Sequence, residues 1–386
     1  MRFRLVLPLC LFAALLTVAL CTGGALFYML AVFIALCLLT GLVSVLWASA
    51  TLRLSAELSA RTVRRGDQAQ LRLTARHQGR LPIAPLCLSL SSPSARREIR
   101  LRDAPGRLQT LTMSIRAAHV GVYPTGVESC TVEDLLGLFS RTVALPGAQV
   151  ELSVLPRTFP TEPLTLSPGD PGSEIMARAT EDLSAPSDVR AYQPGDAMKK
   201  IHWKLSLRKG ELMVRKFDEP VLQDVLILMD CSPPPSWGHP QAAADLRDAL
   251  LETAASVFTD QLAADHVVHM PLSGAHPVDV EKSMGLAIAL ENLARTDFTE
   301  SDRFERVLSL ESRRLRKVGC TVVIAARLTG AMVDIMIRMR RMGPAIRFYL
   351  ITFAPDDANL APLITRLRRA AVEVSLRAVG MDDQPE

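Results

Sequence analysis

The N-terminal part of this sequence lacks charge. Between Arg4 and Arg53 there is no Asp, Glu, Lys, Arg or His. An apolar stretch of this length exceeds what one buried helix of a soluble protein requires. Gly23-Gly24 divides it into residues 5–21 and 25–47, and each part can cross about 30 Å of hydrocarbon as a helix, the first only just.

Backbone groups in lipid must pair within their own segment, so we predict two transmembrane helices in residues 1–50, joined by a tight turn at Thr22-Gly23-Gly24. The alternative is a signal peptide, which MRFR and the following apolar run resemble, ahead of a single anchor. Arg2 and Arg4 flank one end of the apolar region and further arginines flank the other, whereas the turn is uncharged. By the positive-inside rule, the chain is predicted to be a multi-pass protein of the cell inner (cytoplasmic) membrane, with its soluble body in the cytoplasm.

Several motifs of known chemistry are also missing. The seven cysteines form no C-x-x-C pair, which argues against a zinc site and a disulfide framework. No G-x-x-x-x-G-K-[ST] or G-x-S-x-G sequence occurs, which excludes P-loop nucleotide hydrolysis and the nucleophile elbow. After Trp47 there are 42 basic and 40 acidic residues, a balance that argues against nucleic-acid binding.

Residues 51–160 have the pattern of β-strands. Apolar and polar residues alternate at 70–76, 85–90, 110–116 and 150–156, with turn-forming residues between them. Alternation of this kind predicts an antiparallel β-sandwich-like domain. Residues 161–187, which include LSPGDPGSE, are predicted to be a linker.

Residues 224–386 change to a pattern of continuous apolar strands alternating with amphipathic helices. This pattern predicts a doubly wound α/β domain with a mostly parallel sheet, whose ligands bind at the carboxyl ends of the strands. Strands are expected at 224–230, 266–272, 321–328, 346–354 and 372–379. Helices are expected at 241–262, 281–295, 302–317, 330–342 and 357–371.

Between these domains, residues 188–223 contain DVRAYQPGDAMKKIHWKLSLRKG. Asp196 is placed to cap a helix over residues 197–209 that ends at Gly210, and residues 211–219 read as a strand that enters the α/β sheet. Residues 199–216 hold seven basic residues and one acidic residue.

Three interpretations of this segment remain open. Its cations, Lys204 and Arg208 among them, could bind an anion or an acidic partner. His202 could act as an acid-base group oriented by Asp196 or Asp188. Alternatively the segment is structural, with Asp188, Arg190 and Asp196 in ion pairs and Trp203 filling a domain interface.

The same residues resemble the signature of the bacterial domain-of-unknown-function 58 family. That signature has an Arg-x-Tyr-x-Pro-Gly-Asp turn, then Ile-His-Trp-Lys and a basic strand. The matching residues are Arg190, Tyr192, Pro194, Gly195, Asp196, Ile201, His202, Trp203, Lys204 and Arg208. Upstream, residues 134–139 resemble the family's Asp-Pro-Leu-Gly-Leu-Phe, with Leu135 in place of Pro.

The resemblance implies a partner and a fold. Members of the family commonly accompany MoxR-type AAA ATPases, and their α/β body is similar to a von Willebrand factor type A domain. Such a domain binds a divalent cation through Asp-x-Ser-x-Ser after its first strand. Here Asp230 and Ser232 match the first two positions, but the third is Pro234, and Arg327 follows a later strand where Asp is usual. We therefore expect no cofactor beyond weak Mg²⁺ binding at a degraded site.

Together these observations predict a membrane-anchored, cytoplasm-facing adaptor or assembly factor, not an enzyme, working with a MoxR-type AAA ATPase. The first alternative is a membrane-bound enzyme that uses His202 and Asp196 as an acid-base pair. The second is an extracytoplasmic binding module, should the predicted orientation be reversed.

Overall fold

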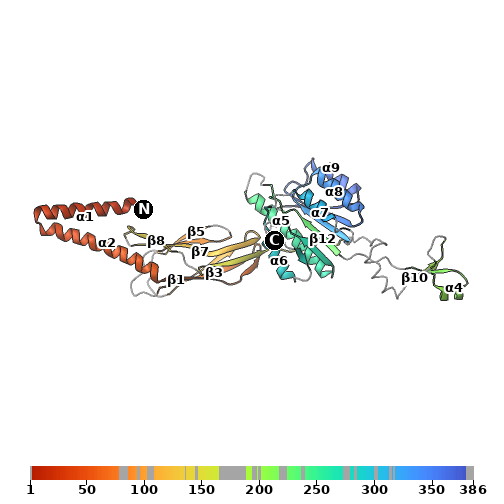
Figure 1. Ribbon diagram of the computed structural model, residues 1–386, viewed down its shortest axis with the longest axis horizontal. Helices are drawn as coiled ribbons and strands as arrows, with labels where there is room; N and C mark the ends of the chain where they lie inside the picture. Colours follow the sequence, from red (N-terminus) through yellow and green to blue (C-terminus); the bar gives the residue numbers. More distant parts are fainter. Residues whose placement is uncertain are drawn as a thin grey trace. The chain divides into compact units, whose positions relative to one another are not determined.

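The computed structural model shows two compact units, Met1–Leu155 and Pro156–Glu386 (Figure 1). The description covers residues 2–77, 86–93, 96–101, 108–134, 136–143, 147–164, 188–193, 198, 201–216, 224–235, 240–272, 279–281, 285–299, 303–312, 315 and 318–379.

The first unit begins with two apolar helices, α1 (Arg2–Thr22) and α2 (Ala25–Thr51). Gly23, with φ of 66°, separates them, a conformation that favours glycine. Within the described residues, α2 is the one helix long and apolar enough to cross a membrane, and the apolar helical stretch Val6–Thr22 is shorter.

Two sheets with a common core follow the helices. One has the order β1-β3-β6, and the other has the order β2-β9-β7-β4-β5 with β8 paired to β7. The strands are β1 (Leu52–Leu58), β2 (Thr62–Arg64), β3 (Gln68–His77), β4 (Leu86–Ser91), β5 (Arg97–Leu101), β6 (Leu108–Arg116), β7 (Gly121–Glu133), β8 (Ser140–Val143) and β9 (Gln149–Leu155). Leu71, Leu88 and Leu152 belong to one buried cluster that both sheets line. The four predicted strand segments coincide with β3, β4, β6 and β9.

The loop between β7 and β8 packs against α2. Asp134 Oδ1 accepts a hydrogen bond from the Phe139 amide at 2.9 Å, which closes the loop. A Cβ added to Gly41 of α2 would lie 3.0 Å from Asp134 Oδ2, so glycine at this position allows the close approach. The C-terminal half of α2 thereby contacts the β-domain at β7, β8 and the loop between them.

The second unit contains a six-stranded sheet with the order β14-β13-β12-β15-β16-β17. All neighbouring pairs are parallel except β13–β14. The strands are β12 (Asp224–Met229), β13 (Val267–Pro271), β14 (Asp279–Glu281), β15 (Cys320–Ala325), β16 (Ala345–Thr352) and β17 (Glu373–Ala378). The helices are α5 (Pro240–Ala263), α6 (Leu286–Ala294), α7 (Phe304–Glu311), α8 (Gly330–Arg341) and α9 (Leu360–Arg369).

Helices cover both faces of this sheet (Figure 1). Residues of α7, α8 and α9 share a core with Leu226, Val323 and Phe348, while α5 packs on β12 and β13. The predicted strands and helices of residues 224–386 all lie at these elements, and β14 was not predicted.

Two boundaries differ from the prediction. The predicted linker begins at residue 161, but Thr161 is bound to α5 through Asp260 Oδ2 at 2.6 Å, so the α/β unit includes the start of that segment. Residues 165–187 lie outside the described part of the chain. The strand predicted at 211–219 is β11 (Met213–Lys216), which pairs with β10 (Asp188–Ala191) in a separate ribbon and not with the six-stranded sheet.

Candidate functional site

The signature segment forms a two-stranded ribbon with a short helix, α4 (Trp203–Lys209), between its strands. In the antiparallel register Asp188 faces Lys216 and Arg190 faces Val214. The Tyr192 amide donates to Leu212 O at 2.8 Å and extends this pairing. Pro194, Gly195 and Asp196, and the side chains of Asp188 and Arg190, lie outside the described residues, so the predicted Asp196 cap and ion pairs remain predictions.

The helix begins later than the predicted residue 197. The His202 amide donates to Met213 O at 2.8 Å, and Ile201 forms a bridge with Val214, so both residues belong to the ribbon. His202 instead caps α4, because its Nδ1 accepts from the Leu205 amide at 3.2 Å. Gly210, with φ of 74°, ends the helix as predicted.

Ser206 fixes α4 to the ribbon, and the sequence analysis missed it. Its Oγ donates to His202 O and accepts from the Met213 amide at 2.8 Å. A small hydroxyl residue in the middle of a helix was the available signal, since such residues bond to nearby backbone groups.

The outer side of α4 combines apolar and basic side chains. Trp203 is 57% exposed and Leu207 is 84% exposed, one helical turn apart. Lys204 and Arg208, which follow them, are also exposed. Trp203 therefore lies at the surface among the described residues, and its predicted place in a domain interface stays a prediction.

A second candidate lies at the carboxyl ends of β12 and β15. Asp230 follows β12, is 5% exposed, and accepts hydrogen bonds at Oδ1 from the amide (3.0 Å) and the hydroxyl of Ser232. Arg327, which follows β15, donates from Nη2 to Ser232 Oγ at 2.5 Å and to Pro233 O at 3.2 Å.

These residues do not fit the divalent cation that the family resemblance implies. A hard cation requires several oxygen ligands, and Pro234 supplies no side-chain oxygen at the third position. The Arg327 guanidinium, itself a cation, already uses the Ser232 hydroxyl that would coordinate a metal.

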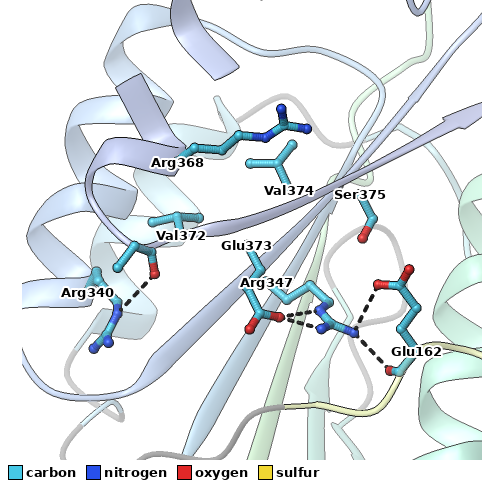
Figure 2. A pocket seen from close by; sticks show the side chains of 9 residues that line it. Glu162, Arg340, Arg347, Arg368, Val372, Glu373, Val374 and Ser375 are labelled. Carbon is cyan, nitrogen blue, oxygen red and sulfur yellow. Dashed lines mark hydrogen bonds and ion pairs between the residues drawn. The ribbon is translucent and has the colours of Figure 1, made fainter. Parts of the chain in front are cut away.

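A hollow of about 530 Å³ opens at the other end of the same sheet, at the amino ends of β16 and β17. Figure 2 shows Arg347 between Glu373 and Glu162. Arg347 Nε donates to Glu373 Oε2 at 2.8 Å, Nη2 donates to the same oxygen, and Nη1 donates to Glu162 O at 2.8 Å. Burial lowers the pKa of Arg347, but the hydrogen bonds and charge interactions with Glu373 and Tyr349 together raise it by more, so the net shift of the pKa is upward.

Glu373 and Glu162 of the same chain bind the guanidinium of Arg347, so we assign Arg347 a structural role and not a role in ligand binding. Such an internally paired arginine is called a brace below. The sequence analysis did not identify Arg347. An arginine inside the apolar run IRFYLITFA was the signal, since a buried charge requires a partner.

Comparisons with known proteins agree with the signature. Residues 188–270 match a family described as "Protein of unknown function DUF58". The chain is 24% identical over 242 residues to the uncharacterized protein YeaD of Bacillus subtilis (strain 168). That match covers 59% of this chain and 60% of YeaD, so the chain spans less than two thirds of its curated relative.

Solved structures give only distant similarity. An alkylpurine DNA glycosylase, AlkC, of Pseudomonas fluorescens, bound to DNA containing an abasic site analog, is 15% identical with a TM-score of 0.17, covering 33% of this chain and 41% of its own. Cwp6 from Clostridium difficile is 10% identical with a TM-score of 0.15, covering 86% of this chain and 38% of its own. Such TM-scores are too low to indicate a common fold. The segment 188–270, which contains the signature, is therefore similar to the DUF58 family, and the match to YeaD supports this similarity.

Proposed function

We propose that this protein is a membrane-anchored adaptor or assembly factor that binds a protein partner and catalyses no reaction itself. The observation that carries the proposal is the outer side of α4, where exposed Trp203 and Leu207 lie next to Lys204 and Arg208. Tryptophan is enriched among the residues that dominate binding energy, and flanking cations select an acidic partner.

The geometry of His202 supports a role without catalysis. Its Nδ1 accepts a hydrogen bond from the Leu205 amide, so the neutral imidazole carries its proton on Nε2. To act as a general base at Nε2, His202 would have to change tautomer and give up the cap of α4. The alternative enzyme, with His202 and Asp196 as an acid-base pair, requires that loss.

The proposed anchor is a transmembrane hairpin of α1 and α2 in the cell inner membrane, with the soluble body in the cytoplasm. The length of α2, 27 residues or about 40 Å, and its apolar composition support a membrane span. The attachment of α2 to the loop at Asp134 would hold the β-domain close to the bilayer.

The proposed partner is a MoxR-type AAA ATPase, inferred from the family resemblance, and the α/β domain is proposed to be von Willebrand factor type A-like. The parallel sheet covered on both faces supports this comparison.

Capture of a MoxR-type ATPase of the same organism by the full chain in detergent tests the proposal. We expect Lys204→Glu with Arg208→Glu to abolish capture, and Trp203→Ala to weaken it. The matched control reverses two exposed arginines of the α/β domain, Arg338→Glu with Arg369→Glu, and should leave capture unchanged. If the wild type did not capture the ATPase, the proposed partner would be wrong. If all variants captured it equally well, the outer side of α4 would not be the binding surface.

The orientation needs a separate test. A reporter fused after Glu386 should be active in the cytoplasm. Activity confined to the periplasm would instead support the extracytoplasmic binding module.

A further inference from the structure

The six-stranded sheet has a topological switch point between β12 and β15. From β12 the sheet continues to β13 and β14 on one side, and from β15 it continues to β16 and β17 on the other. Connections that diverge in this way leave a crevice outside the carboxyl ends of the two central strands. Asp230 and Arg327 are the first charged residues after these strands, so they lie at the edge where this class of sheet binds ligands.

Neutral acceptors hold the guanidinium of Arg327 in place. Its Nη2 binds Ser232 Oγ and Pro233 O, and Ser232 is in turn fixed by Asp230 Oδ1. Arg327 is exposed, and among the described residues no carboxylate lies within ion-pair distance of it and no acceptor binds its Nε or Nη1. Three of its five N–H donors therefore point to no partner in the described part of the chain.

The N-terminus of α8 adds positive potential next to Arg327. Thr329 caps α8 by accepting from the Met332 amide at 3.2 Å, so the N-terminus of α8 begins three residues after Arg327. The aligned peptide dipoles of a helix favour an anion at that end. Glu305, the nearby carboxylate, accepts a hydrogen bond from Thr329 at 2.8 Å.

We propose that this edge, the Arg327 site, binds a carboxylate of an acidic side chain on a partner protein without any metal ion. The Arg327 guanidinium binds the partner's carboxylate in the way that a bound divalent cation would. Ser232, itself hydrogen-bonded to Asp230, orients the guanidinium. A guanidinium matches a carboxylate in two parallel hydrogen bonds. Asp230 and Glu305 make the site less favourable for the higher charge of phosphate. The proposal does not depend on the role of α4.

The test uses the full chain in detergent and two Gly-Ser peptides with capped ends, one with a single Asp and one with Asn at the same position, and follows their binding by saturation-transfer NMR. We expect the Asp peptide to bind equally well with Mg²⁺ and with EDTA, and the Asn peptide to bind at least about tenfold more weakly. Arg327→Gln should weaken binding of the Asp peptide by about tenfold, and Arg327→Lys by less. Arg338→Gln, the same charge change at the opposite end of α8, should have no effect.

Four outcomes would overturn the proposal: no binding of the Asp peptide to the wild type, a requirement for Mg²⁺, an equal loss in Arg338→Gln, or stronger competition by inorganic phosphate than by acetate. Should Arg327→Gln not fold, Ser232→Ala serves instead, because it removes the hydroxyl that orients the guanidinium. Neither variant alters α4, so capture of the ATPase through α4 is scored independently.

Discussion

The two edges of the α/β sheet each carry an arginine, and the two arginines are used in opposite ways. At the amino edge, the Arg347 side chain is 8% exposed and is bound by Glu373 and Glu162 of the same chain. At the carboxyl edge, Arg327 is exposed and is held by a hydroxyl and a carbonyl, and no carboxylate of the described residues lies within ion-pair distance of it. One edge is closed by internal ion pairs, and the other presents a positioned cation to solvent.

This difference indicates that Arg347 serves stability and that Arg327 serves binding. A buried guanidinium requires its own carboxylate, and removing that carboxylate is costly. An exposed guanidinium contributes little to folding, so its positioning by Ser232 and Asp230 serves another purpose. The cost of each substitution therefore distinguishes a brace from a binding group.

The largest effect is expected at the closed edge. Glu373→Ala should lower the free energy of unfolding of the α/β domain by about 2–3 kcal/mol, because Arg347 stays buried with only Glu162 near it. Pulse proteolysis in urea measures this. The control is the exposed pair Arg366–Asp334, where Asp334→Ala should cost at most about 1 kcal/mol. If Glu373→Ala and Asp334→Ala lowered the free energy of unfolding equally, the Arg347–Glu373 pair would not differ from an ordinary surface ion pair.

The next effect depends on pH. Burial raises the pKa of the Cys320 thiol, at the same closed edge, from 9.0 to about 12. The folded state thus favours the neutral thiol, and this contribution to stability is complete below pH 9 and is lost as the pH rises toward 12. The loss is about 1.4 kcal/mol for each pH unit above 9, so at pH 10 it is smaller than the cost expected for Glu373→Ala. Cys320→Ala should flatten the pH dependence of unfolding, and an unchanged slope would show that the thiol is not its source.

At the open edge, Asp230→Ala should cost about 1 kcal/mol, because the amide and hydroxyl of Ser232 lose their acceptor. The same pulse proteolysis measures it. Asp230→Asn keeps an oxygen acceptor and should cost less. If both substitutions lowered the free energy of unfolding as much as Glu373→Ala, the residues at the carboxyl edge would serve stability as well.

The smallest effect on stability is expected for Arg327→Ala, under about 0.5 kcal/mol, since its acceptors become hydrated in its absence. Arg347→Ala, measured in parallel, should cost several times more. A large loss of stability in Arg327→Ala would contradict the assignment of Arg327 to binding.

The sequence predicts the α/β unit well because its strands are continuous apolar runs and its helices are amphipathic. Asp230, Ser232 and Arg327 could also be related from the sequence, because each lies at or just beyond the carboxyl end of a predicted strand. The pairing of Arg347 with Glu373 could not, since it depends on the register of β16 and β17, in which these two residues face each other. No local pattern fixes the register of parallel strands.

The signature segment was predicted less accurately for a similar reason. The start of α4 depends on the backbone contacts of residues 201–202 with β11, and these contacts exclude both residues from the predicted helix. Local propensity favoured a helix from residue 197, but long-range pairing determined where it begins. Met198, the described residue of that stretch, lies outside α4.

The central claim, that a guanidinium takes the position of a metal ion at the carboxyl edge, is tested most directly by titrating Mn²⁺ into the full chain and following free Mn²⁺ by electron paramagnetic resonance. The account predicts that wild type, Asp230→Asn and Ser232→Ala give the same titration curve, with no specific ion bound. One Mn²⁺ bound by the wild type and lost in both variants would contradict it.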